Sequence, residues 1–198
     1  MDISKLEKSV TGRGMGFKFF QTGAEAADYL AGELSGTSVG IGGSKTVEAI
    51  GLYEKLEDRA EVYWHWKQEP NEARAKAAHT EAYVSSANGI SETGEIVNID
   101  GAGNRVASIL YGHSRVYIVA GVNKIMPDLD SAIFRARNTA APLNARRFGT
   151  NTPCGKGELK CWDCRSPERI CRGMEITMAP MMGMEKLEVI IINEELGY

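Results

Sequence analysis

The chain has 198 residues, of which 43% are hydrophobic and 25% are charged, and its formal net charge is −3. These values are typical of one globular domain with a sizeable core. The acidic balance argues against nucleic acid or a membrane surface as a partner, since both would need a basic excess. No apolar run approaches the roughly 20 residues that span a bilayer, and the N-terminus lacks a secretory signal. We therefore expect a cytoplasmic protein with reduced cysteines.

Strand-like and helix-like patterns alternate along most of the chain. In order, they predict strands at 17–20, 37–41, 62–66, 82–86 and 116–120, with helices at 23–34, 46–56, 70–79, 104–111 and 127–140 between and after them. Thr22 and Glu25 have the spacing of a capping box before the first helix. Two further strands, at 176–178 and 189–192, close the chain.

This alternation, with apolar central strands, predicts an α/β fold with an open, mainly parallel sheet flanked by helices. We expect an α/β domain over 1–150, a cysteine-rich insertion over 151–173, and closing strands of the same domain over 174–198.

The first candidate site is a glycine-rich turn between a strand and a helix. Residues 39–47 read Val-Gly-Ile-Gly-Gly-Ser-Lys-Thr-Val. Glycines let a ligand approach backbone N–H groups, and a helix N-terminus favours anions, so phosphate or carboxylate is the expected ligand class. Val39 and Ser44 stand where a P-loop needs glycine. The alternative is a tight turn with Ser44 as a helix cap.

Two later loops follow predicted strands and should lie at the same edge of the sheet. Glu92 is the candidate catalytic carboxylate, as nucleophile, general base or anchor, with a solvated turn residue as the alternative. For Lys124 the alternative is an exposed loop lysine. Asn144, Arg146 and Arg147 come next, and the histidines are scattered without ligand spacing. The candidate ligand-binding residues are Gly42, Gly43, Ser44, Lys45, Thr46, Asn88, Asp100, Asn104, Arg105, Asn123 and Lys124.

The second candidate site is a cluster of cysteines in the pattern C-x6-C-x2-C-x6-C. It contains Cys154, Cys161, Cys164 and Cys171, which are all the cysteines of the chain. Four thiolates suit tetrahedral zinc or an iron–sulfur cluster, and neighbouring lysines and arginines favour the thiolate form. The alternative is four free or redox-active thiols. The spacing is neither that of a zinc ribbon nor that of a ferredoxin, so both metals remain open.

Several motifs in a fixed order carry a resemblance to a known family. They are 40–52 (GIGGSKTVEAIGL), 86–107 (SANGISETGEIVNIDGAGNRVA), 119–125 (VAGVNKI) and 142–147 (PLNARR). Together they resemble the LUD-domain family of lactate-utilisation proteins from about residue 20 to the end. The cysteine-rich tail is similar to a stand-alone branch seen largely in anaerobic bacteria. The segment before residue 20 is shorter than the N-terminal helix usual in the family.

The resemblance implies a fold like that of the ribose-5-phosphate isomerase and coenzyme A transferase superfamily. It also implies a role in oxidising L-lactate with iron–sulfur partner subunits. Three hypotheses follow: a subunit of 2-hydroxy-acid oxidation, a self-contained enzyme on a phosphorylated metabolite or acyl thioester, and a non-catalytic ligand-binding regulator. In each the partner is a small anionic metabolite, and a homo-oligomer is compatible with the sequence.

Overall fold

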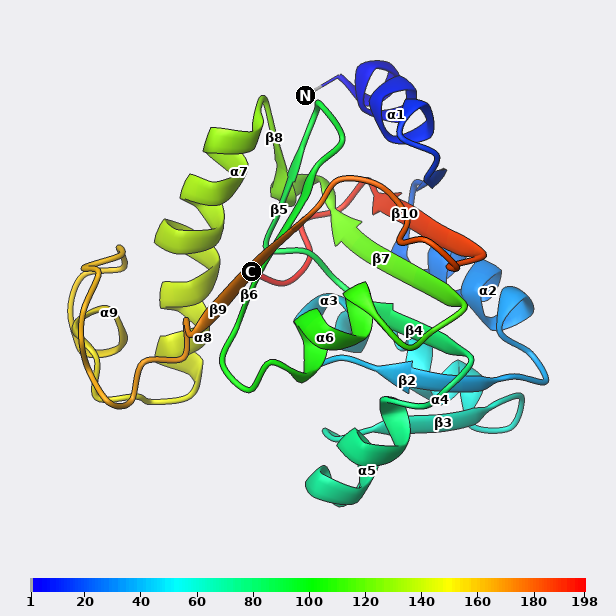
Figure 1. The fold of residues 1–198 in the computed structure, drawn as a ribbon, viewed down its shortest axis with the longest axis horizontal. Coiled ribbons are helices and arrows are strands. Elements are labelled where there is room, and N and C mark those ends of the chain that lie inside the picture. Colours follow the sequence, from blue (N-terminus) through cyan, green and yellow to red (C-terminus); the bar gives the residue numbers. More distant parts are fainter. Residues whose placement is uncertain (1) are drawn as a thin grey trace.

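A computed structural model describes residues 2–198, and its centre is a six-stranded sheet (Figure 1). All neighbouring strands in this sheet pair in parallel, which confirms the predicted sheet type. From one edge to the other, the strands are β1 (Gly16–Phe20), β10 (Lys186–Ile192), β7 (Arg115–Gly121), β4 (Ala82–Ser85), β2 (Ser38–Ile41) and β3 (Glu61–Trp64). Strands β7 and β10 are buried on both faces, as expected of a sheet covered by helices.

Helices α2 (Gly23–Glu33), α3 (Lys45–Ala49) and α4 (Leu52–Leu56) pack on one face of this sheet. The predicted capping box is present, because the Thr22 side chain accepts a hydrogen bond from Glu25 N and the Glu25 carboxylate accepts one from Thr22 N. The helix predicted at 46–56 is in fact two helices. Gly51 separates them with a left-handed φ of 66°, a conformation that glycine adopts at no steric cost.

The opposite face carries α1 (Ile3–Gly12), α6 (Asn104–Leu110) and a second, smaller sheet, while α5 (Pro70–Ala77) packs on β2 and β3. The small sheet has the order β8 (Ile125–Met126), β5 (Gly89–Ser91), β6 (Ile96–Asp100), β9 (Gly173–Thr177). The predicted strand at 176–178 belongs to this sheet as β9. The hairpin of β5 and β6 lies in a stretch that the sequence indicated only as a loop, because its strands are short and stand among polar and glycine residues.

A long helical segment covers the far side of the small sheet (Figure 1). It consists of α7 (Leu129–Arg135), a π-helical turn (Ala136–Ala140) and α8 (Ala141–Arg147). The sequence predicted a helix ending at residue 140, but Pro142 stands in the first turn of α8, where a missing N–H costs least. The short helix α9 (Pro153–Lys156) follows, and residues 157–172 have no regular structure. No helix within residues 2–198 has both the length and the apolar character needed to cross a membrane.

Candidate functional site

A cavity of about 480 Å³ lies at the carboxyl ends of four adjacent strands of the main sheet. Gly43 follows β2, His65 follows β3, Ser86 follows β4 and Lys124 follows β7. Helix α8 and residues 168–172 form the opposite wall. This is the edge at which open parallel sheets bind ligands. We call it the anion cavity, for the charges described below.

The glycine-rich turn contributes Gly43, Ser44 and Lys45 to this cavity. The Ser44 hydroxyl accepts from Val47 N at 3.1 Å and so caps α3, which was the alternative considered for this turn. The absence of a side chain at Gly43 keeps this part of the turn open. A Cβ there would stand only 3.3 Å from His65 Nε2 and from the Trp66 ring. The turn therefore offers a bare backbone and the Lys45 side chain to a ligand, while its hydroxyl serves the helix.

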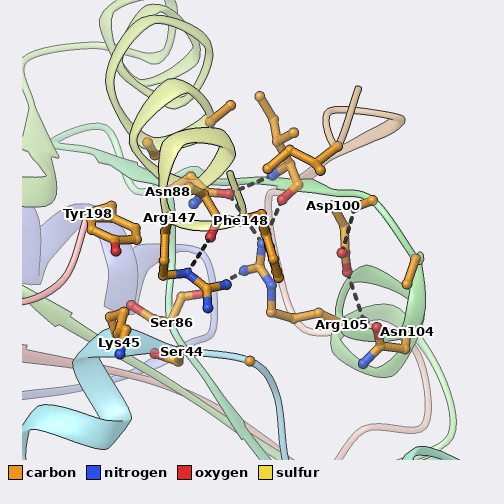
Figure 2. Close-up of a pocket in the computed structure, with 18 of the residues that line it drawn as sticks. Ser44, Lys45, Ser86, Asn88, Asp100, Asn104, Arg105, Arg147, Phe148 and Tyr198 are labelled. Atoms are coloured by element: carbon orange, nitrogen blue, oxygen red, sulfur yellow. Dashed lines mark hydrogen bonds between the residues drawn. The ribbon is translucent and has the colours of Figure 1, made fainter. Parts of the chain in front are cut away.

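A hydrogen-bonded network around Arg105 forms the cavity floor (Figure 2). The guanidinium donates to Asn88 Oδ1 at 3.2 Å, to Ile99 O at 2.7 Å and to Asn98 Oδ1. The Asp100 carboxylate accepts from the backbone N–H groups of Gly101 and Arg105, so it fixes the start of α6. The guanidinium of Arg105 is thus held in place by neutral acceptors and not by a hydrogen-bonded carboxylate.

Basic side chains dominate the lining of the anion cavity: Lys45, Arg74, Arg105, Lys124, Arg147, Arg169 and Arg172, against Asp100 and Glu168. The two carboxylates are already engaged, since Glu168 accepts from Asn151 N at 2.7 Å. Within residues 2–198, the arginines that form ion pairs with carboxylates are Arg13, Arg115 and Arg137, none of which lines this cavity. The arginines of this cavity therefore have no carboxylate ion-pair partner among the described residues, whereas Lys45 pairs with Glu48.

Arg74 adds an unusual donor to this surface. It lies on α5, is half-buried, and its Nε is a buried atom with no hydrogen-bond partner in the described chain. A buried polar group without a partner costs free energy, so such groups in native proteins need an explanation. This Nε is closed to solvent, so a ligand in the anion cavity would meet other atoms of the Arg74 side chain instead.

Lys124 is a deeply buried amine in the cavity. Its side chain is only 3% exposed, and Nζ lies 2.9 Å from both Thr46 Oγ1 and Ser86 Oγ. Burial, followed by the charges of Arg135 and Arg105, lowers the pKa of Lys124 well below its ordinary value. An amine that loses its proton this readily can act as a general base or nucleophile. The exposed loop lysine considered from the sequence is not what the structure places here.

His65 is a second neutral group beside the glycine-rich turn. Burial and the nearby Arg74 lower the pKa of His65 to about 4, with Asp100 acting weakly in the opposite direction. The imidazole is therefore uncharged near neutral pH and can donate or accept one hydrogen bond. The sequence offered no ligand spacing for this residue, and its place in the cavity follows from the position of β3.

The structure brings together eight of the predicted ligand-binding residues as cavity lining: Gly43, Ser44, Lys45, Asn88, Asp100, Asn104, Arg105 and Lys124. The other three lie just behind them. A Cβ on Gly42 would meet Tyr83, Ser85 and Arg105. The Thr46 hydroxyl bonds Lys124 and Leu196 O, and Asn123 Oδ1 accepts from Leu196 N. These three residues support the cavity from outside its surface.

Glu92 does not line the anion cavity. It follows β5, which carries it away from Asn88 toward the tip of the β5–β6 hairpin. There its carboxylate accepts from Asp2 N at 2.9 Å and from Lys5 Nζ at 3.1 Å. These contacts hold the pKa of Glu92 below its ordinary value and fasten α1 to the hairpin. The sequence placed Glu92 directly after a strand of the main sheet because the hairpin was not recognised.

The four cysteines are half-buried and unbridged, and they line one small cavity between α8 and residues 152–171. We call it the cysteine cavity. Among the described residues, no three His, Cys, Asp or Glu groups stand close enough to hold a single metal ion. The metal site expected from the sequence, with zinc or an iron–sulfur cluster as its occupant, stays a prediction.

Sequence reasoning missed several residues of the anion cavity. Arg74 and Trp66 come from elements whose helical or strand pattern carries no binding signal, and Tyr198 comes from the end of the chain. Residues 168–172 were assigned only to the cysteine cluster, yet Glu168, Arg169, Ile170 and Arg172 line the anion cavity. The density of arginine around Cys171 was the signal that could have indicated this second role.

Comparison with known proteins was made against families, curated sequences and solved structures. The LUD domain family model matches residues 3–192. The chain belongs to the LUD-domain family. No curated protein matches it in sequence. Among solved structures, it is similar to a DUF162 family protein from Deinococcus radiodurans, with a TM-score of 0.59 and 15% identity over 96% of this chain and 95% of that one. That similarity shows the fold alone, while family membership supports a role related to lactate utilisation at the level of the family.

Proposed function

We propose that this LUD-domain protein binds a small carboxylate, such as L-lactate or another 2-hydroxy acid, in the anion cavity and takes part in its oxidation. The observation that carries the proposal is the set of arginines without carboxylate partners around one cavity at the sheet edge. A charge-assisted hydrogen bond from arginine to a carboxylate is about twice as strong as a neutral one.

In this proposal Lys124 is the base that accepts the proton of the substrate hydroxyl. Its lowered pKa leaves an amine able to accept a proton, and it lines the cavity beside Ser86 and Asn88. Oxidation of a 2-hydroxy acid to a 2-oxo acid releases two electrons and two protons. Lys124 would take the hydroxyl proton. The C2 hydrogen would leave with both electrons as a hydride to a flavin partner subunit, or as a proton to water when the electrons pass to an iron–sulfur partner, as expected for the family.

The binding step is tested by Arg74→Met, measured by calorimetry with L-lactate and pyruvate. Loss of one charge-assisted hydrogen bond costs roughly 1.5–3 kcal/mol, which corresponds to about 10- to 100-fold weaker binding. The matched control is Lys76→Met on the same helix, because Lys76 is exposed, pairs with Glu72 and does not line the cavity. Equal affinities of Arg74→Met and the wild-type protein would contradict the proposal.

The size of the cavity favours one alternative. About 480 Å³ is more room than a three-carbon acid needs, and it falls in the range of pockets for larger ligands. A phosphorylated metabolite or an acyl thioester would fill it better and would also use several arginines. The same calorimetry with ribose 5-phosphate and acetyl-coenzyme A decides between them, since the 2-hydroxy-acid proposal requires tighter binding of lactate or pyruvate than of either.

A further inference from the structure

Residues 149–173 lack a hydrophobic core of their own. Of the described residues in this stretch, none contributes an apolar side chain to the buried core. Order here comes instead from hydrogen bonds such as Cys161 N to Asn138 Oδ1 at 3.0 Å. A segment of this kind is commonly held by a bound metal, because in such loops binding free energy is also folding free energy.

The backbone around the central pair turns both of its thiols toward the cysteine cavity. Asp163, between Cys161 and Cys164, has a φ of 44° and is the one non-glycine residue in the described chain with a positive φ. Arg169 then joins the third and fourth cysteines, since its side chain donates to Cys164 O at 2.8 Å and to Cys171 O at 3.2 Å. Strained backbone of this sort is retained where function requires it.

Two arginines donate directly to sulfur. Arg169 Nη2 lies 3.5 Å from Cys171 Sγ, and Arg137 Nη2 lies 3.7 Å from Cys161 Sγ. Asp163 N donates to Cys161 Sγ at 3.4 Å. Arg137 belongs to the π-helical turn, which is a feature often found at functional sites. Positive charge and N–H donors beside sulfur stabilise thiolates and tune iron–sulfur clusters.

We propose that the four cysteines ligate a [4Fe–4S] cluster inside the cysteine cavity. All four cysteines line the same small cavity, which is about 20 Å³ in volume, so the loop of residues 152–171 would open around a cluster bound there. Among the described residues, no three of them are grouped so as to hold a single metal ion. A cubane separates its cysteine ligands more widely than zinc does, because iron and sulfide lie between them. The proposal is independent of which ligand occupies the anion cavity.

The test is the iron and sulfide content of protein purified or reconstituted without oxygen. We expect close to one cluster per chain, a brown colour, and an electron paramagnetic resonance signal after reduction. Cys161→Ser should lose most of the iron, whereas Arg165→Ser, an exposed neighbour in the same loop, should keep it. Zinc in place of iron, or metal-free protein with four titratable thiols, would overturn the proposal.

A second variant keeps the test valid if Cys161→Ser fails to fold. Arg137→Met removes a donor to Cys161 Sγ and leaves all four ligands. Because N–H···S bonds favour the more negative, reduced cluster, the reduction potential of this variant should fall while its iron content stays unchanged. A wild-type potential in Arg137→Met would show that the cluster does not lie where the structure indicates.

Discussion

Replacing Lys124 by methionine should change the pH dependence of stability. The side chain is almost fully buried beside Arg105 and Arg135, and both Nζ contacts are to hydroxyl groups. Since burial lowers the folded-state pKa, the unfolded chain binds more protons between that pKa and the ordinary value of about 10.4. Within this window the free energy of unfolding of the wild-type protein rises with pH by up to about 1.4 kcal/mol per unit, and it stops rising above 10.4.

Methionine keeps the length of the side chain but cannot titrate, so this contribution disappears. The variant loses two hydrogen bonds worth about 1 kcal/mol each, although Ser86 Oγ and Thr46 Oγ1 are already 3.3 Å apart and can bond to each other. We therefore expect Lys124→Met to be at least as stable as the wild-type protein near neutral pH. As the pH rises toward the alkaline range, the free energy of unfolding of the wild-type protein should increase steadily relative to that of the variant.

Urea denaturation of both proteins from about pH 7 to about pH 10 measures this difference, because other titrating groups cancel. Thr46→Val is the control, since it removes a hydroxyl contact while keeping the amine and should retain the wild-type pH slope. A stability difference between Lys124→Met and wild type that does not vary with pH would show that Lys124 stays protonated. That result would also contradict the proposed role of Lys124 as a base.

Other variants test the rest of the structure. Arg147→Met removes a cation that stacks on Trp66 at 5.1 Å and lines the anion cavity, so anion affinity should fall about fivefold, which is the effect of roughly 1 kcal/mol at an exposed site. Arg146→Met, its neighbour outside the cavity, should bind like the wild-type protein by the same calorimetry. Gly43→Val should abolish anion binding with an unchanged circular dichroism spectrum, since its side chain would project toward His65 and Trp66; retained affinity would contradict the assigned cavity. Glu92→Gln should leave anion affinity unchanged and lower stability by less than about 1 kcal/mol near neutral pH, with this loss vanishing in acid as Glu92 protonates through its lowered pKa; a large loss of activity would restore Glu92 as a catalytic candidate. Reconstitution with iron and sulfide should tighten anion binding, because residues 168–172 wall both cavities, and equal affinities before and after loading would show that the two sites are independent.

Local signals in the sequence were sufficient for most of the main sheet. The capping box at Thr22 and the apolar run of β7 depend on neighbouring residues, so they can be predicted without tertiary contacts. The hairpin of β5 and β6 could not be predicted in this way. Its strands are stabilised by pairing with β8 and β9, and β9 lies more than 70 positions further along the chain.

For the anion cavity, the predictable part was the set of loops that follow parallel strands. Their common edge places Gly43, Asn88, Arg105 and Lys124 together. The remaining feature, the burial of the Lys124 amine, depends on tertiary packing. Nothing in the sequence distinguishes Lys124 from a surface lysine, because its burial results from the packing of residues 196 and 197 over Thr46 and the amine.

The pairing of β1 with β10 has a consequence for the synthesis of the protein. Gly16 aligns with Glu188 and Phe20 with Ile192, and β1 has no other neighbour in the main sheet. During synthesis on the ribosome, therefore, the strand Gly-Phe-Lys-Phe-Phe stays unpaired until β10 has emerged. Contacts between such distant segments form slowly, and an unpaired aromatic strand is prone to aggregate. The nascent chain should depend on chaperones more than its size suggests, and a message truncated before β10 should yield insoluble protein.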